Sequence, residues 1–153
     1  MKKIIIIAAM VLGFAVAASA QPRAIGVRLG NGGEISYQHT LGNNFLEVDG
    51  GLGIFNGINI GATGIYNFMI AQPSWTSRGT WGFYAGPGAG VAMGLGEENN
   101  FLSVSVAGMI GLEYTFDFPL QLSIDLRDNI GLGFGGHGLW NHPSVALGVR
   151  YRF

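Results

Sequence analysis

The last eleven residues of the chain, Pro143 to Phe153 (PSVALGVRYRF), alternate between two kinds of side chain. Because successive side chains of a β-strand point to opposite faces, this segment is predicted to be a strand with two chemically different faces. The apolar face carries Val145, Leu147, Val149, Tyr151 and Phe153. The other face carries Ser144, Ala146, Gly148, Arg150 and Arg152. A strand of this kind fits a wall between an apolar and a polar environment.

The same period-two pattern recurs along the chain, between short segments rich in the turn formers Gly, Asn, Asp and Pro. We predict seven further strands, over residues 23–30, 34–41, 45–54, 58–69, 80–93, 101–116 and 120–127. Pro87 cannot donate a backbone hydrogen bond, so a β-bulge is predicted near it. The glycine-rich segment 128–142 is predicted to be a loop. Eight strands joined by turns predict an all-β, eight-stranded antiparallel up-and-down barrel.

The N-terminal segment has the form of an export signal. Two lysines precede an apolar run, Ile4 to Ala17, which is followed by the small residues Ala18-Ser19-Ala20. This order predicts a secretory signal peptide over residues 1–20, cleaved after Ala20. The run is shorter than the roughly 17–25 residues that span a bilayer, which disfavours a transmembrane helix. The chain has no cysteine, so we expect neither a lipid anchor nor disulfides, and residues 21–153 form one exported barrel domain.

The composition favours a barrel in lipid. Charged residues make up 11% of the chain, against roughly 25% in soluble domains. Both lysines lie in the predicted signal peptide, which leaves six arginines against nine acids. No apolar run after residue 20 is long enough for a spanning helix, and 27 glycines accompany the alternating segments. These features predict a transmembrane β-barrel, and nothing in the charge balance indicates a nucleic-acid partner.

A soluble lipocalin-like barrel shows the same alternation with its apolar face inside, so the orientation of the faces needs separate evidence. The polar face here is made of glycine, serine and a few balanced charges, and it lacks the Lys/Glu-rich coat that water requires. Aromatic pairs also recur on the apolar face at one end of the strands, where they form a predicted interfacial girdle. Its members are Tyr66, Phe68, Trp81, Phe83, Tyr114, Phe116, Tyr151 and Phe153.

Charged residues on the predicted inward face are Arg28, Arg127, Arg150, Arg152, Glu34, Glu47, Asp49, Glu113 and Asp125. An eight-stranded barrel is just wide enough to be filled by its own side chains, so these charges must pair or stay hydrated. A structural salt-bridge core is therefore favoured over a substrate path or proton relay. A lumen charge cluster is predicted from Glu113, Asp125, Arg127, Arg150 and Arg152. If Leu126 faces Val149, Asp125 lies opposite Arg150.

Catalytic and metal-binding patterns are weak. His137 and His142 flank Trp140 in the predicted last loop, Ser144 follows, and His39 lies at a strand end. A single Ser and His in a glycine-rich loop are better explained by loop polarity than by nucleophilic catalysis. The histidines lack metal-ligand spacing, and the glycines of the loop lack the strand-to-helix context of a phosphate site. We therefore predict no catalytic, metal or cofactor site.

The runs FYAGPGAGVAMG, GLEYTFDFPLQLSIDLR and VALGVRYRF resemble the small outer-membrane β-barrel proteins of Bacteroidetes-type bacteria, which are OmpA-like eight-stranded barrels. The last strand also resembles the insertion signal of outer-membrane barrels. Gly148, Tyr151 and Phe153 match that signal, whereas Ala146 stands where a polar residue is usual. The family usually has a proline after the arginine of the seventh strand, where this chain has Asp128.

The resemblance implies a monomer in the outer membrane, surrounded by lipid and inserted with periplasmic chaperones and the barrel-assembly machinery. Two classes of function stay open: a structural or interaction protein of the envelope, which we favour, and a lipid A-modifying acyl hydrolase or transferase. Lipid A deacylases are also small barrels, but their local pattern is not matched. His142 is followed by Pro143 and Ser144 without the Asn expected next. A narrow, porin-like pore is a lesser alternative, because the lumen is expected to be filled.

Overall fold

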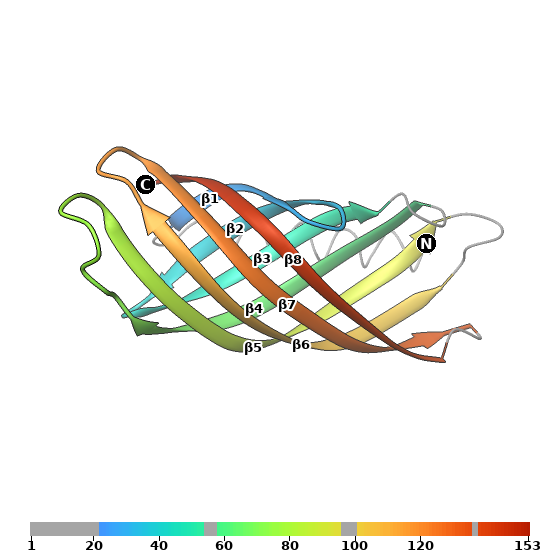
Figure 1. The fold of residues 1–153 in the computed structure, drawn as a ribbon. Coiled ribbons are helices and arrows are strands. Elements are labelled where there is room, and N and C mark those ends of the chain that lie inside the picture. The colour runs from blue at the N-terminus through green and yellow to red at the C-terminus, as the bar shows by residue number, and fades with distance from the viewer. Residues whose placement is uncertain (1–21, 54–57, 96–100, 136–137) are drawn as a thin grey trace.

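The computed structural model describes residues 22–53, 58–95, 101–135 and 138–153, and within them the chain is a closed all-β barrel without helices (Figure 1). Each strand pairs antiparallel with its neighbours in sequence, and pairing of the first strand with the last closes the barrel. The predicted eight-stranded up-and-down architecture is confirmed. The predicted signal peptide and its cleavage site lie outside the described residues, as does His137.

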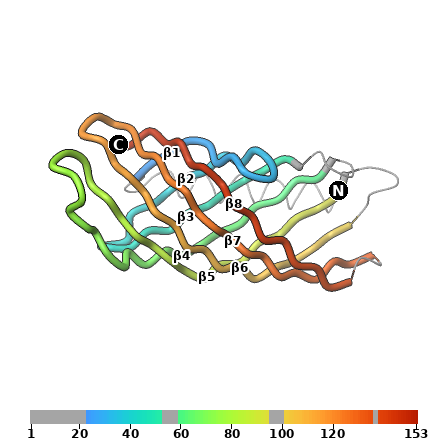
Figure 2. The backbone as a smooth tube through the Cα atoms, viewed as in Figure 1, coloured from blue at the N-terminus to red at the C-terminus, as the bar shows by residue number. Residues whose placement is uncertain are grey.

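The strands are β1 (Pro22–Leu29), β2 (Gly33–Leu41), β3 (Asn44–Gly53), β4 (Ile58–Ala71), β5 (Thr80–Leu95), β6 (Leu102–Thr115), β7 (Leu120–Phe134) and β8 (Gly138–Arg152). β1 to β3 have 8, 9 and 10 residues, whereas β4 to β8 have 14 to 16. The two described chain ends lie together, since Ala24 pairs with Arg152. We call this end of the barrel the terminal end and the opposite one the distal end. At the distal end β7 and β8 continue well past the β1–β2 turn (Figure 2).

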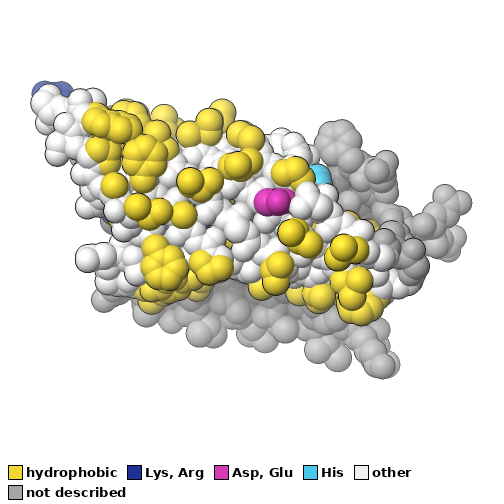
Figure 3. All heavy atoms as spheres, turned by 60° about the horizontal axis from the view of Figure 1, so that its bottom comes forward, with side chains coloured by type: hydrophobic (Ala, Val, Ile, Leu, Met, Phe, Trp, Pro, Cys, Tyr) yellow, Lys and Arg dark blue, Asp and Glu magenta, His cyan; other side chains and the backbone are white. Residues whose placement is uncertain are grey.

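Large apolar side chains point outward and are exposed. Examples from different strands are Ile35 (62%), Val106 (65%) and Leu147 (59%). β7 shows the regularity clearly, because its residues alternate between buried and exposed from Gln121 to Phe134. Hydrophobic side chains are accordingly spread along the face shown in Figure 3, with few charged groups among them. The predicted assignment of the apolar face to the outside of the barrel is therefore correct.

The lumen is filled by side chains rather than by a channel of uniform width. On the wall formed by β3 to β6, Phe45, Ile65, Tyr84 and Met109 form a small apolar cluster. The rings of Phe45 and Tyr84 meet edge to face, with centroids 5.2 Å apart, a favoured aromatic geometry. The rest of the buried lumen is occupied mainly by polar and charged groups.

The predicted loop over residues 128–142 is wrong. β7 continues to Phe134, and β8 begins at Gly138, so most of this segment is a long hairpin. Its glycines alternate with outward side chains, among them Ile130 and Leu132, so the period of two is preserved. Gly131 and Gly133 therefore lie on the inward face of β7, whereas Gly135 and Gly138, which have positive φ, lie at the turn of the hairpin.

Pro143 fits within β8 because, in the described chain, the ladder between β1 and β8 ends before it reaches Pro143. β1 ends at Leu29, which lies opposite Leu147. The Pro143 carbonyl accepts a hydrogen bond from Asn31 Nδ2 in the β1–β2 turn (3.4 Å). The backbone groups of Pro143 therefore face the β1 side, where its missing N–H removes no ladder bond.

The predicted bulge near Pro87 is also wrong. Pro87 pairs with Gly108 of β6 in an unbroken register. On the β4 side the register is the same before and after Pro87, and its irregularity lies between Met69 and Ala71. The missing N–H of Pro87 is accommodated without an inserted residue.

The relative position of β7 and β8 differs from the predicted one by four residues. Val149 lies opposite Leu122, and Leu126 lies opposite Val145. An even shift leaves every side chain on its predicted face, which is why alternation could not reveal it. The predicted pairing of β6 and β7 is correct, since Gly111 faces Asp125.

Gly111 offers a test of lumen packing. A methyl group built on Gly111 would overlap the Tyr84 ring, whereas one built on Gly108 of the same strand would meet nothing within 4 Å. We expect Gly111→Ala to lower the free energy of unfolding of the refolded protein by about 1–3 kcal/mol, because the filled lumen must shift. Gly108→Ala should change it by less than about 0.5 kcal/mol. Urea titrations of both variants measure this difference, and equal losses would contradict the packing described.

Candidate functional site

The lumen contains three successive groups of ion pairs, and the first lies near the terminal end. Arg23 pairs with Glu113 and donates to the side-chain oxygen of Gln38. Gln121 Nε2 donates to Glu113 Oε2 at 3.0 Å, so the carboxylate has two kinds of donor. The guanidinium carbon of Arg23 also lies 4.1 Å from the centroid of the Phe45 ring, a cation–π contact.

Arg150 is the centre of the second group. Its Nη2 lies 3.0 Å from Glu47 Oε1, and both side chains are fully buried. Arg150 also donates from Nε to Ser36 Oγ (2.9 Å) and from Nη1 to Ser123 Oγ (2.7 Å). Gln38 Nε2 donates to the second oxygen of Glu47 at 2.5 Å. A buried charge is tolerated when it is paired and hydrogen-bonded in this way.

The third group lies closest to the distal end and joins two arginines to three carboxylates. Arg28 pairs with Asp125 (2.5 Å) and Glu34 (2.6 Å). Arg127 pairs with Glu34 (2.5 Å) and Asp49 (2.8 Å). Glu34 therefore bridges the two guanidinium groups, and its own side chain is the most exposed of the five, at 20%.

The predicted lumen charges do point inward, but they do not form a single cluster. Glu113, Asp125, Arg127 and Arg150 are buried, and they are divided among the three groups. Arg152 lies partly exposed at the terminal end, where Nη1 donates to Thr115 Oγ1 at 3.3 Å. The predicted position of Asp125 opposite Arg150 is wrong: Asp125 lies opposite Ala146 and binds Arg28, while Arg150 lies opposite Gln121.

Arg23 was missed because the alternation of β1 places it beside outward residues. The register of β1 against β2 shifts between Pro22 and Ala24, and this irregularity turns Arg23 toward the lumen. One indication of an inward Arg23 was available in the sequence. The predicted inward face has more carboxylates than arginines, and Arg23 lies near the start of the first strand.

Gly148, one of the three residues matching the insertion signal, has a structural role of its own. A side chain on Gly148 would overlap the guanidinium of Arg150 and the Ser123 hydroxyl. The other two, Tyr151 and Phe153, are exposed, and their rings meet at 5.5 Å. Recognition of these residues during insertion stays a prediction.

The predicted girdle residues form an aromatic belt on the outside of the terminal end. Ring centroids lie 5.0 Å apart for Tyr66 and Phe68 and 4.7 Å apart for Trp81 and Tyr114. Further contacts join Tyr114 to Phe116, Trp75 to Phe83 and Phe116 to Phe118. Trp75 and Phe118 were not predicted, because both lie in the turns between strands.

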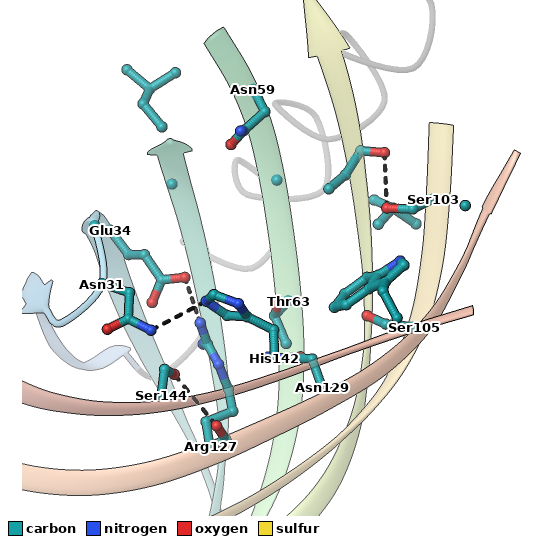
Figure 4. A pocket seen from close by; sticks show the side chains of 18 of the residues that line it. Asn31, Glu34, Asn59, Thr63, Ser103, Ser105, Arg127, Asn129, His142 and Ser144 are labelled. Atoms are coloured by element: carbon teal, nitrogen blue, oxygen red, sulfur yellow. Dashed lines mark hydrogen bonds and ion pairs between the residues drawn. The ribbon is translucent and has the colours of Figure 1, made fainter. Parts of the chain in front are cut away.

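A cavity of about 710 Å³ occupies the distal part of the lumen, beyond the third group of ion pairs. Figure 4 shows Asn59, Thr63, Ser103 and Ser105 on one side, and Glu34, Arg127 and His142 on the other. Asn129, Trp140 and Asn141 of the β7–β8 hairpin also line it. Because residues 128–142 were predicted to form a loop, these side chains were not expected to lie in the lumen. This cavity is the candidate functional site.

His142 and Ser144 both line the cavity, but they do not form a nucleophile–base pair. His142 Nε2 lies 3.2 Å from Asn31 Nδ2, and Ser144 Oγ donates to the Arg127 carbonyl at 3.4 Å. His39 belongs to β2 near the terminal end. Within the described ranges, no group of three or more His, Cys, Asp or Glu side chains could hold a metal ion.

In the part of the chain that the structure describes, no helix has the length and apolar character needed to cross a membrane. No family model matches the chain, and neither does any curated protein or solved structure.

The second group of ion pairs allows a test by double-mutant cycle. We expect Glu47→Gln or Arg150→Gln alone to lower the free energy of unfolding by about 3–5 kcal/mol, because each leaves a buried charge without its partner. The double variant should lose clearly less than the sum of the two. The comparison is the cycle of Asp125→Asn with Arg150→Gln, whose side chains share no hydrogen bond or ion pair and interact only at longer range, so their coupling should be weaker. Stronger coupling in the comparison cycle would refute the described pairing.

Proposed function

We propose that the chain is an integral outer-membrane β-barrel protein with a structural or interaction role in the envelope. The observation that carries this proposal is the inverted distribution of polarity. Large apolar side chains are exposed around the outer wall, with Asp128 of β7 as a charged exception. The strands of the wall instead bury charged groups in the lumen, namely Arg28, Glu47, Asp49, Glu113, Asp125, Arg127 and Arg150. Exposed apolar surface of this extent is unfavourable in water and favourable in lipid.

Closure of the barrel supports the same environment. Every backbone polar group in the hydrocarbon must be satisfied within the protein, and a closed barrel achieves this through its ladders. The β1–β8 ladder runs from Ala24–Arg152 to Leu29–Leu147, so the part of the wall nearest the terminal end has no free edge.

The aromatic belt supports an orientation. Trp and Tyr prefer the interface between hydrocarbon and water, so the terminal end lies at one membrane surface, on the periplasmic side in this proposal. Ile110 lies four residues along β6 from Tyr114 of the belt. With a rise of about 3.3 Å per residue and a tilt of about 40°, Ile110 lies about 10 Å from the belt, near the middle of a band about 25 Å tall. The base of the distal cavity, where Arg127 pairs with Met109, then lies within the band, and Ser103 at its far end lies near the outer surface.

A structural role is favoured over catalysis and conduction by the contents of the lumen. His142 and Ser144 have partners other than each other, so no observation favours an acyl hydrolase or transferase. Three groups of paired charges and the cluster around Tyr84 fill the lumen below the cavity, which disfavours a pore.

Export and membrane insertion can be tested together. In a Gram-negative host, the protein should be recovered with outer-membrane vesicles and should resist extraction by alkaline carbonate. On gels run in mild detergent, unboiled and boiled samples should migrate differently, because the closed barrel is a compact folded species. A soluble protein recovered in the periplasmic extract would show the proposal to be wrong.

The proposed environment of the outer wall predicts a specific substitution effect. Ile110 is 55% exposed, so in water Ile110→Arg would change the free energy of unfolding by less than about 0.5 kcal/mol. In a bilayer we expect a loss of about 2–4 kcal/mol, measured by urea unfolding from phospholipid vesicles. Leu139→Arg is the matched control. Leu139 is 79% exposed on the distal part of β8, outside the apolar band, so its loss should stay below about 1 kcal/mol. Equal effects of the two substitutions would count against a lipid-facing wall.

A further inference from the structure

The distal cavity combines neutral polar side chains with one aromatic residue. Hydroxyl and amide groups line it from four of the long strands, and they include Asn59, Thr63, Ser105, Asn129 and Ser144. They come from β4, β6, β7 and β8, so the ladders of the barrel hold them in fixed relative positions. A cavity of about 710 Å³ is of the size that takes a small organic ligand.

At the base of the cavity three carboxylates outnumber the two guanidinium groups that they bind. Arg28 and Arg127 are the cations of the third group of ion pairs, and Glu34, Asp49 and Asp125 neutralise them within hydrogen-bonding distance. A phosphate or carboxylate ligand would have to compete with these carboxylates for the guanidinium groups. The base of the cavity therefore favours a neutral ligand over an anion.

Two polar atoms of β7 lack a partner in the part of the chain described. Asn129 Oδ1 is an acceptor and Arg127 Nε carries a donor hydrogen, and both atoms are buried. Asn129 is 8% exposed and lines the cavity together with Arg127, two residues away on the same face. One residue thus has an unmet acceptor and the other an unmet donor, and a hydroxyl group, which both donates and accepts, has the chemistry to satisfy either.

Trp140 supplies an apolar surface in the same cavity. A methyl group built on Gly131, its pairing partner in β7, would overlap the indole. One face of the ring therefore packs against the Gly131 backbone, and the opposite face is turned to the cavity that Trp140 lines. The electron-rich face of an indole attracts polarised C–H groups such as those of a sugar ring.

We propose that the distal cavity binds a short neutral saccharide, with a sugar ring packed on Trp140 and ring hydroxyls bonded to Asn129 and Arg127. This inference goes beyond the proposed envelope role and does not depend on the lipid environment of the wall. The same sugar chemistry can come from a soluble oligosaccharide or from the sugar portion of a glycolipid in the outer leaflet. The two sources are distinguished by the test.

Binding is measured on refolded protein by Trp140 fluorescence. The chain has three tryptophans, so Trp75→Phe with Trp81→Phe leaves Trp140 as the single one. The two replaced residues contact each other at the terminal end, away from the cavity. The micelles must be of an amine-oxide detergent, since sugar-headed detergents would occupy the site themselves. The probes are glucose, cellobiose and lactose, with glucose 6-phosphate as the anionic comparison and purified lipopolysaccharide as the glycolipid. Calorimetry on the unsubstituted chain provides an independent dissociation constant.

We expect a saturable change with at least one neutral sugar, with a Kd of about 0.1–10 mM, and weaker binding of glucose 6-phosphate. Asn129→Ala should weaken binding by about three- to tenfold, the effect of one neutral hydrogen bond. Gly131→Ala should weaken it as well, by displacing the indole. Gly108→Ala is the matched control and should leave binding unchanged, since its methyl group meets nothing within 4 Å.

A response to free sugars that depends on Asn129 assigns the site to soluble saccharides. A response to lipopolysaccharide alone, again dependent on Asn129, assigns it to the glycolipid. The proposal is overturned if no probe gives a saturable change up to about 100 mM. It is also overturned if glucose 6-phosphate binds more tightly than glucose, or if Asn129→Ala and Gly131→Ala bind as well as Gly108→Ala.

Discussion

Burial of guanidinium and carboxylate groups in a narrow lumen is the constraint on which the rest of the barrel depends. An isolated ion there would be strongly unfavourable, so every buried arginine must meet a carboxylate from another strand. Arg150 of β8 meets Glu47 of β3, and Arg28 of β1 meets Asp125 of β7. These pairs cross the lumen and connect strands that share no ladder. They therefore favour one stagger of the strands among those that preserve the alternation.

The glycines follow from the same constraint. Large inward side chains need room that only a neighbour without a side chain provides: Arg150 lies against Gly148, and Tyr84 lies against Gly111. The abundance of glycine in the chain thus reflects the filling of a narrow cylinder. Turn geometry explains only a few of these glycines. Within the described ranges, those with positive φ are Gly42, Gly79, Gly135 and Gly138.

Alternation was sufficient to predict the eight strands and the face of nearly every side chain, because period two directly reports which residues share a face. It could not predict which residues meet across the lumen, because a shift by an even number of residues leaves the faces unchanged. The position of Asp125 opposite Arg150 was wrong for this reason. Arg23 was missed because a local irregularity reverses its face. The cavity was missed because glycines between residues 128 and 142 were interpreted as a loop.

The unequal lengths of the strands leave the barrel with a sloping rim, and Pro143 determines what that rim can do. Beyond Leu147, β8 has no partner in β1 within the described ranges. An unpaired strand edge can template the addition of a strand from another molecule. On this edge, Pro143 offers no N–H and Asn31 Nδ2 engages its carbonyl. Pro143 therefore interrupts the row of donors and acceptors on this edge, so a strand from another molecule could not form a continuous ladder along it.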